Sequence, residues 1–407
     1  MAGPLSKIRV LDLSRVLAGP WASQNLADLG ADVIKLERPK IGDDSRAFGP
    51  PWVKDREARD TRDSAYFTSA NRGKRSVTLN IARPEGQAIA RELAGLCDVL
   101  IENYKFGDLA RYGLGYADLN AVNPRLIYCS VTGFGQTGPY REHPGYDFMI
   151  QGMGGMMSVT GEPDGAPGGG PQRAGVPIAD IITGMYASIA ICAALAHRAE
   201  SGLGQHLDLA LLDSQIALLA YQNTNYFATG VPPRRIGNLH PNIVPYQPFK
   251  SSDGEVIVAC GNDNLFRKFC DAAGCSELAQ DPRFVTNGKR VENRAEITRL
   301  INAVMRKKTT AEWLELLEAA GVPNGPINDI AQVFQEPQVQ ARGVKIELDH
   351  AAAGKLPLVA SPMRFSATPL EYRLPPPLLG EHTDEVLRSL LGKSDAEIAR
   401  LRAEEII

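Results

Sequence analysis

The chain has 407 residues, of which 44% are hydrophobic and 22% are charged, a composition typical of globular proteins. This length exceeds one ordinary hydrophobic core and predicts two domains. A formal net charge of -3 provides no basic field, which argues against a protein that binds nucleic acid.

The first third of the sequence alternates short apolar strands with helices. Strands are predicted at 8–13, 32–36, 98–101 and 126–131, and helices at 21–29 and 84–96. This alternation predicts an α/β fold with a largely parallel, doubly wound sheet. Ligands of such sheets lie beyond the carboxyl ends of the strands.

The middle of the chain begins with a Gly/Pro-rich segment, 138–176, that is too long for a simple connection and predicts a functional loop. A helix follows from about 180 to 202, then a strand at 205–211 and a helix capped by Asp213 that reaches about 226. The longest apolar stretch of the chain, Ile178 to Ala196, belongs to the helix at 180–202. It contains Asp180 and ends at His197-Arg198, so we expect a buried core helix and no membrane association.

The composition changes to Pro, Arg, Asn and Gly at 229–253, which marks the expected domain boundary. A strand at 255–259 and helices near 265–273, 294–306 and 310–319 predict a small α+β domain. A last amphipathic helix is expected at 381–391.

The six cysteines form no Cys-x-x-Cys pair, as is typical of a reducing compartment. The first ten residues lack the apolar segment of a signal peptide. We therefore expect a cytoplasmic protein, with an organelle as the open alternative.

Asp180 is a single carboxylate between a Gly/Pro-containing approach and a long apolar helix. There the helix dipole and unpaired backbone N–H groups are expected to keep it ionised and fixed, as a carboxylate nucleophile requires. An aspartate just ahead of an apolar helix is usually only an N-cap, and this is the favoured interpretation of Asp180 when it is considered alone.

Other motifs are less informative. Gly133 to Gly138 matches Gly-x-Gly-x-x-Gly, but the segment from Pro139 to Pro144 does not continue as a helix, so we expect a turn near a ligand rather than a nicotinamide site. The six histidines show no metal-ligand spacing, and His143 is interpreted as structural. No metal is expected.

Basic residues recur after the early strands, and the parallel sheet is expected to bring them to one rim that could hold a phosphorylated cofactor. Solvated surface charge is the alternative explanation. The residues are Arg38, Lys74, Arg75, Lys105 and Arg111.

Several stretches together resemble the class III CoA-transferases, the group that includes formyl-CoA:oxalate and carnitine CoA-transferases and the α-methylacyl-CoA racemases. They are 10–13, 18–20, 29–37, 102–104, 133–135, 179–180 and 379–387. The resemblance implies an interlocked homodimer in which each subunit has a Rossmann-like large domain built from both chain ends. The implied domains are 1–228, a small domain with its linker at 229–324, and a returning segment at 325–407.

The resemblance also implies a nucleophilic role for Asp180, which would form a mixed anhydride and then an aspartyl-CoA thioester. A Gly-rich cover at 152–155 or 168–170 would exclude water from the anhydride. Coenzyme A enters as the acyl-CoA substrate, with Arg38 and Arg111 as partners for its phosphate and adenine groups. The implied CoA contacts are Val16, Ala18, Arg38, Leu79, Asn80, Ile81, Ala82, Asn103, Tyr104, Lys105, Arg111, Tyr146 and Asp147.

Two departures narrow the expected reaction. Tyr146 stands where the racemase branch has a proton-transferring histidine, and Leu17 stands where the oxalate branch has a glutamine. The segment 234–246 resembles members that use succinyl-CoA with a dicarboxylic acceptor. Its candidates for binding a distal carboxylate are Arg234, Arg235, Asn238 and His240, unless the segment is a linker packed on the partner subunit.

The sequence therefore predicts a CoA-transferase that moves CoA from an acyl-CoA donor to a carboxylic acid. The expected donor is succinyl-CoA, and the expected acceptor is a dicarboxylic acid. An acyl-CoA epimerase and a CoA-binding protein without turnover remain the alternatives.

Overall fold

The computed structural model describes residues 3–407, which divide into two compact units. The larger unit comprises residues up to Met156, Ala174–Thr229 and Val339–Ile407, and the smaller comprises Met157–Arg173 and Gly230–Gln338. The smaller unit thus extends to Gln338 rather than 324. It also includes 157–173, because the N–H of Gly237 donates to the carbonyl of Gly161 and Arg235 pairs with Asp164.

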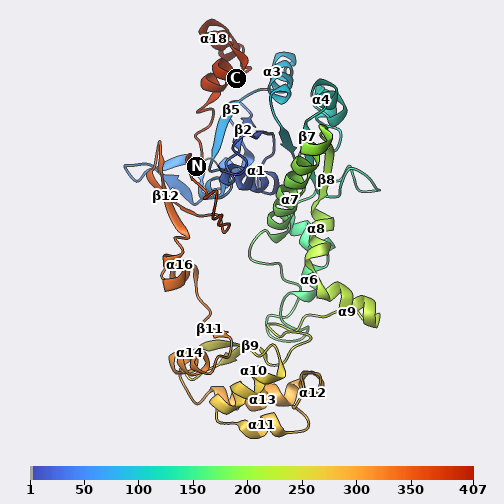
Figure 1. The fold of residues 1–407 in the computed structure, drawn as a ribbon, viewed down its shortest axis with the longest axis vertical. Coiled ribbons are helices and arrows are strands. Elements are labelled where there is room, and N and C mark those ends of the chain that lie inside the picture. The colour runs from blue at the N-terminus through green and yellow to red at the C-terminus, as the bar shows by residue number, and fades with distance from the viewer. Residues whose placement is uncertain (1–2) are drawn as a thin grey trace. The chain divides into compact units, whose positions relative to one another are not determined.

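A six-stranded parallel sheet forms the centre of the larger unit (Figure 1). Its spatial order is β5-β2-β1-β6-β7-β8. Numbered within the sheet in chain order, this is 3-2-1-4-5-6, the Rossmann arrangement, whose direction reverses between β1 and β6. The strands are β1 (Arg9–Asp12), β2 (Asp32–Glu37), β5 (Lys74–Thr78), β6 (Val99–Glu102), β7 (Ile127–Thr132) and β8 (His206–Ala210).

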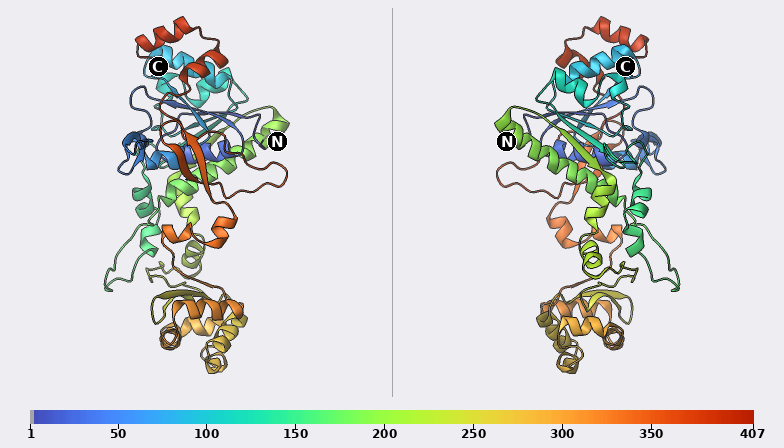
Figure 2. Two further views of the ribbon diagram at one scale, coloured as in Figure 1. Left: turned by 90° about the vertical axis from the view of Figure 1, so that its left-hand side faces the viewer. Right: turned by 90° about the vertical axis from the view of Figure 1, so that its right-hand side faces the viewer.

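Successive residues of the strands point to opposite faces, and both faces are covered by helices. Val10 and Val33 pack on one face, and Leu11 and Ile34 on the other. The first face carries α1 (Ala18–Asp28), α5 (Asp147–Met153), α7 (Ile178–Ser201) and α8 (Leu211–Leu218). The second carries α3 (Pro84–Gly95), α4 (Tyr116–Val122), α17 (Thr383–Leu391) and α18 (Asp395–Ala403), so that the red C-terminal helices lie beside α3 across the sheet from α7 (Figure 2).

The predicted parallel α/β sheet is confirmed, and the predicted strands match β1, β2, β6, β7 and β8 within one or two residues at each end. The sequence analysis missed several further elements of the larger unit. They are β5, the hairpins β3 (Trp52–Lys54) with β4 (Asp60–Ser64) and β12 (Lys345–His350) with β13 (Gly354–Val359), the short helices η1 (Asp44–Ala47), α2 (Ala65–Ser69) and η2 (Ala110–Tyr112), α5, which lies within the segment expected to be a loop, and α18.

The helix predicted to begin at Asp213 is two helices. α8 begins at Leu211, with Ala210 as its N-cap, and the chain breaks at Ala220, whose φ is 45°, before α9 (Tyr221–Thr229). Asp213 lies in the first turn of α8 rather than capping it.

Among the described residues, α7 is the one helix that is long and apolar enough to cross a bilayer, with 24 residues and a mean hydropathy of 1.8 over its most apolar window.

The smaller unit is an α+β structure with its own apolar core. An antiparallel sheet in the order β11-β10-β9 packs against helices through buried side chains such as Phe249, Phe266 and Trp313. Its main elements are β9 (Tyr246–Lys250), β10 (Glu255–Ala259), β11 (Asn324–Gly325), α10 (Asp263–Ala272), α11 (Ser276–Gln280), α12 (Asn287–Glu292), α13 (Arg294–Met305), α14 (Thr310–Ala319) and α15 (Ile330–Val333). The remaining short helices, α6 (Met156–Val159) and α16 (Pro337–Ala341), lie where the chain passes between units.

Candidate functional site

A cavity of about 200 Å³ lies at the carboxyl ends of four neighbouring strands, β1, β6, β7 and β8. The segments that follow these strands supply much of its wall, including residues 15–18, 103–106, Gly133 and Leu211. It therefore occupies the point where the strand order reverses, which is the usual ligand crevice of such sheets. Asp180 is among its lining residues.

Asp180 lies in the first turn of α7, as the third residue after the N-cap, Pro177. The N-terminus of α7 is capped from another element, because Asp147 accepts hydrogen bonds from the N–H of Ala179 at 2.8 Å and from that of Asp180 at 3.4 Å. Gln151 donates to the second oxygen of Asp147 at 2.7 Å. Asp180 is thus not the cap, and its carboxylate is left to the cavity.

Burial and repulsion from Asp147 raise the pKa of Asp180 to about 7. Both effects oppose the ionised state that this helix terminus was expected to favour. The terminal N–H groups are bound by Asp147, whose carboxylate lies beside Asp180. A carboxyl with a pKa near neutrality in a cavity is typical of a catalytic group.

The phenol of Tyr66 on α2 is also within electrostatic reach of this pair. Burial, then the charges of Asp180 and Asp147, raise its pKa to about 12, so the phenol remains protonated at neutral pH. Nothing in the sequence near Tyr66 indicated a functional site, because α2 is distant from Asp180 along the chain.

Cationic and aromatic side chains line the cavity. Arg15 binds Asp44 at 3.0 Å and lies over the Tyr104 ring, 5.0 Å from its centroid. Arg141 lies over Phe106 at 4.7 Å. The sequence analysis missed the lining residues Arg15, Asp44, Phe106 and Arg141. Arg15 and Phe106 lie in the segments that follow β1 and β6, and this position could have indicated them.

The cavity brings together seven of the fourteen residues predicted as nucleophile or CoA contacts. Those that line it are Val16, Ala18, Asn103, Tyr104, Lys105, Tyr146 and Asp180. Arg38 does not line it but pairs with the lining residue Asp44. Arg111 is exposed on η2 and pairs with Asp108.

The segment 79–82 after β5 does not line this cavity either. Leu79 is buried in the core, and the N–H of Asn80 donates to the carbonyl of Ile406 near the C-terminus. Ile81 is half-buried and Ala82 is exposed. Their role in binding CoA stays a prediction.

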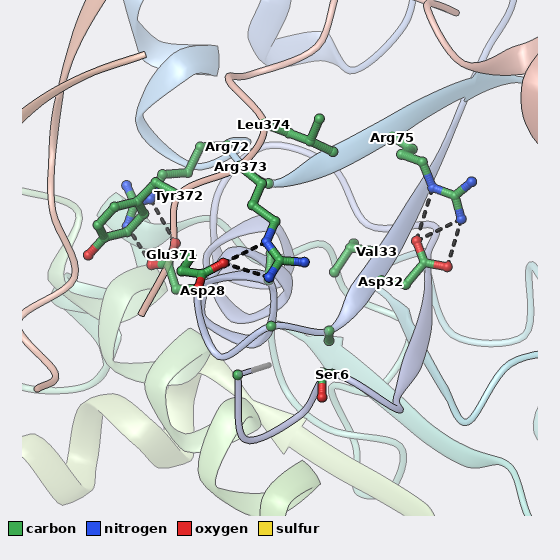
Figure 3. Close-up of a pocket in the computed structure, with 15 residues that line it drawn as sticks. Ser6, Asp28, Asp32, Val33, Arg72, Arg75, Glu371, Tyr372, Arg373 and Leu374 are labelled. Atoms are coloured by element: carbon green, nitrogen blue, oxygen red, sulfur yellow. Dashed lines mark hydrogen bonds and ion pairs between the residues drawn. The ribbon is translucent and has the colours of Figure 1, made fainter. Parts of the chain in front are cut away.

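The expectation that Lys74 and Arg75 join the same rim is wrong. They begin β5, so they lie at the amino end of the strand, and Lys74 is fully buried against Asp12 at 3.2 Å. Arg75 pairs with Asp32 at 2.6 Å and lines a second cavity of about 270 Å³ (Figure 3). The error arose because β5 was not recognised.

This second cavity is lined by cations that are already neutralised. Figure 3 shows Arg72 bound to Asp28, Arg75 to Asp32 and Arg373 to Glu371. Each of these three guanidinium groups is thus held by a carboxylate.

The substrate candidates of the predicted small domain all lie in the smaller unit. Arg235 pairs with Asp164, and Nδ1 of His240 accepts the N–H of Asn242 at 3.1 Å. Arg234 and Asn238 are exposed. Their role in binding a carboxylate stays a prediction.

The Gly133 turn approaches the cavity as expected. No helix begins there, and a Cβ on Gly133 would lie 2.6 Å from the Cα of Gly145, so only glycine allows these two lining segments to meet. His143, interpreted from the sequence as structural, also lines the cavity, and its ring is stacked on that of Tyr140 with 5.0 Å between the ring centroids.

Within residues 3–407, no three His, Cys, Asp or Glu side chains are grouped in a way that could hold a metal ion.

Comparisons with known proteins agree on one family. A family model described as CoA-transferase family III matches residues 5–383. A succinate–glutarate CoA-transferase of Agrobacterium fabrum is 51% identical over 95% of this chain and 96% of its own, and a succinyl-CoA:glutarate CoA-transferase of Mus musculus is 43% identical over 99% and 90%. The crystal structure of a CAIB/BAIF family protein from Brucella suis superposes with a TM-score of 0.83 at 49% identity, covering 96% of this chain and all of that one.

Proposed function

Because the chain belongs to CoA-transferase family III, we propose that it transfers CoA between succinyl-CoA and a second dicarboxylic acid, with glutarate as the first candidate, through covalent intermediates on Asp180. The single observation that supports the nucleophile is the position of Asp180. Its carboxyl lines the cavity at the strand ends, while the N–H groups at the start of α7 are bound by Asp147. The names of the two relatives support the substrates.

In the proposed reaction, an Asp180 oxygen attacks the thioester carbonyl of succinyl-CoA, the C–S bond breaks, and CoA thiolate leaves a succinyl-aspartyl anhydride. The thiolate then attacks the Asp180 carbonyl, releasing succinate and forming an aspartyl-CoA thioester. The acceptor carboxylate displaces the thiolate to form a second anhydride. Attack of the thiolate on the acceptor's acyl carbonyl gives the new acyl-CoA and restores Asp180.

The surroundings of Asp180 suit these steps. A cavity of about 200 Å³ is below the size that encloses a drug-sized ligand, so it would admit the acyl thioester end while the rest of CoA lies outside. There Arg15, Lys105 and Arg141 line the cavity mouth and can attract the CoA phosphates. Arg38, through Asp44, belongs to the same cluster.

We also propose that two copies form the active assembly, an interlocked homodimer. The adjacent helices α5 and α7 expose six large apolar side chains, a set that a single copy leaves to solvent and that a second copy would bury. They are Phe148, Met149, Met153, Met185, Tyr186 and Ile189.

A panel of acyl-CoA donors and carboxylic acceptors, with CoA products separated by chromatography, tests the function. The proposal expects succinyl-CoA with glutarate or another dicarboxylate to be preferred, and Asp180→Ala to lose at least ~10³-fold in transfer while binding CoA with little change. Exclusive use of monocarboxylates would reject the substrates. Near-normal transfer by the variant would reject the nucleophile.

A further inference from the structure

Val16 has a backbone conformation that its side chain disfavours. Its φ is 70°, in the left-handed region that β-branched residues rarely adopt, and it lines the cavity that contains Asp180. The next residue, Leu17, is the N-cap of α1 and provides no side-chain cap, and Leu17 and Ala18 also line the cavity. The conformation of Val16 therefore sets how the start of α1 meets a ligand.

Neighbouring side chains hold the chain in this conformation. The N–H of Val16 donates to Asp43 Oδ1 at 3.0 Å. Asn103 clamps Arg15 from both sides, accepting its N–H at 2.8 Å and donating to its carbonyl at 2.7 Å. Lys35 donates to the carbonyl of Ser14 at 2.8 Å. A strained residue persists only where its surroundings fix it in this way.

Asp43 and Lys35 form a buried ion pair below this loop. Their charged groups are 2.8 Å apart and both side chains are 0% exposed. A second buried pair, Lys74 with Asp12, lies beside it, so the four charges sum to zero. None of the four lines the cavity, and a buried ion pair gives little net stability over apolar residues of similar size. The pair also positions its neighbours, because Asp43 Oδ1 accepts the N–H of Val16 and, as the N-cap of η1, that of Ser45.

We propose that Asp43, oriented by Lys35, is a positioning residue for CoA binding: it accepts the N–H of Val16 and holds the cavity loop in its left-handed form. The inference deepens the proposed function, because it rests on the cavity being the CoA site.

Two matched double variants separate this role from that of the charge. Lys35→Met with Asp43→Asn removes both charges but keeps an oxygen acceptor for Val16, whereas Lys35→Met with Asp43→Leu removes the acceptor as well. The first is expected to bind CoA within ~3-fold of the native chain, and the second ~10- to 100-fold more weakly, the range in which supporting side chains usually act.

Adding Val16→Gly to the second variant supplies the rescue. Glycine adopts positive φ without strain, so CoA affinity is expected to recover at least ~5-fold although the contact of the valine side chain is lost. A merely structural role for Asp43 would not be relieved by a glycine at this position. Circular dichroism of each variant confirms folding.

Equal CoA affinity of the Asn and Leu variants, or no recovery on adding glycine to the folded Leu variant, overturns the proposal. If the Leu variant does not fold, hydrogen exchange of the native chain decides, because the proposal expects the Val16 amide to be strongly protected and rapid exchange overturns it. CoA affinity is measured with CoA alone, so this result does not depend on turnover. Failure of the proposed function is a different result, because it would appear as transfer activity of Asp180→Ala.

Discussion

Asp180 and Asp147 are two carboxylates at the start of α7 that have different tasks. Asp147 is buried and accepts the terminal N–H groups, whereas Asp180 faces the cavity. Burial first, and then repulsion from Asp147, raise the pKa of Asp180. The arrangement provides a nucleophile whose charge depends on pH near neutrality.

The pH dependence of transfer follows from this. Below a pKa of about 7, Asp180 is protonated and cannot attack, so kcat/KM is expected to fall about tenfold per pH unit on the acid side. Asp147→Asn keeps an acceptor for the N–H groups but removes the repulsion, so the acid limb is expected to move to lower pH. Burial, the larger cause, remains, so the limb should not reach the ordinary value for aspartate, 3.8.

Asp44→Asn is the matched control, since Asp44 lines the cavity but is not a cause of the shift at Asp180. It should leave the acid limb in place even if CoA binding weakens. Two results would contradict the role of Asp180 and Asp147 in this pH dependence. One is a native kcat/KM profile whose acid side lies near pH 4, and the other is an equal shift of the acid side in both variants.

A position directly after a strand predicted the lining of the cavity only in part. Asn103, Tyr104 and Lys105 follow β6 and line the cavity. Arg38 follows β2 and Leu79 follows β5, but neither lines it, because the cavity lies at the carboxyl ends of β1, β6, β7 and β8. Lys74 and Arg75 failed because the strand they belong to was missed. The role proposed for Asp43 could not be predicted from the sequence, because it depends on a hydrogen bond from Val16, which is distant along the chain.

At the scale of elements, α1 and α7 approach closely at Gly184. A Cβ there would lie 2.6 Å from the carbonyl oxygen of Ala18 and 3.0 Å from the Trp21 side chain. Because Gly184 has no side chain, α7 can pack against the start of α1, which lines the cavity. The close packing connects the position of the nucleophile to that of the loop at Val16.

Gly184→Ala is expected to lower stability by about 1–3 kcal/mol, because overpacking against a backbone carbonyl outweighs the better helix propensity of alanine. Gly288→Ala is the control: Gly288 also lies in a helix, but nothing lies within 4 Å of its added Cβ. It should raise stability slightly. Thermal unfolding checks both, and a Gly184 variant as stable as the native chain would show that this contact gives way easily.

The periodic elements were predictable because each depends on nearby residues. The parallel strands and the helices 84–96 and 310–319 follow from apolar spacing and from caps such as Thr309 with Glu312. The hairpins β3–β4 and β12–β13 were missed because their short, mostly polar strands lack a clear alternation. The division of 211–229 into two helices depends on one backbone angle at Ala220.

For the whole molecule, sequence patterning alone did not predict that both chain ends build one unit; the family resemblance implied it. The segment 157–173 joins the smaller unit through contacts with 235–237, which are distant in sequence and therefore leave no periodic signal.

The proposed homodimer makes a further prediction. Ile189, 62% exposed on α7, would be buried between copies, so Ile189→Glu should shift the mass measured by light scattering toward the monomer and lower transfer activity. Val122→Glu, on an apolar residue that is 56% exposed at the end of α4 on the other face of the sheet, should leave the mass unchanged. A native chain that is monomeric at all concentrations would reject the dimer.

Acylation of Asp180 during turnover is open to direct observation by mass spectrometry. When the protein is quenched during transfer from succinyl-CoA and digested, the peptide that contains Asp180 is expected to carry the acyl or CoA adduct, or a hydroxamate after hydroxylamine treatment, and Asp180→Ala is expected to carry none. An unmodified Asp180 peptide at every time point, while the product acyl-CoA accumulates at the full rate, would contradict the covalent mechanism.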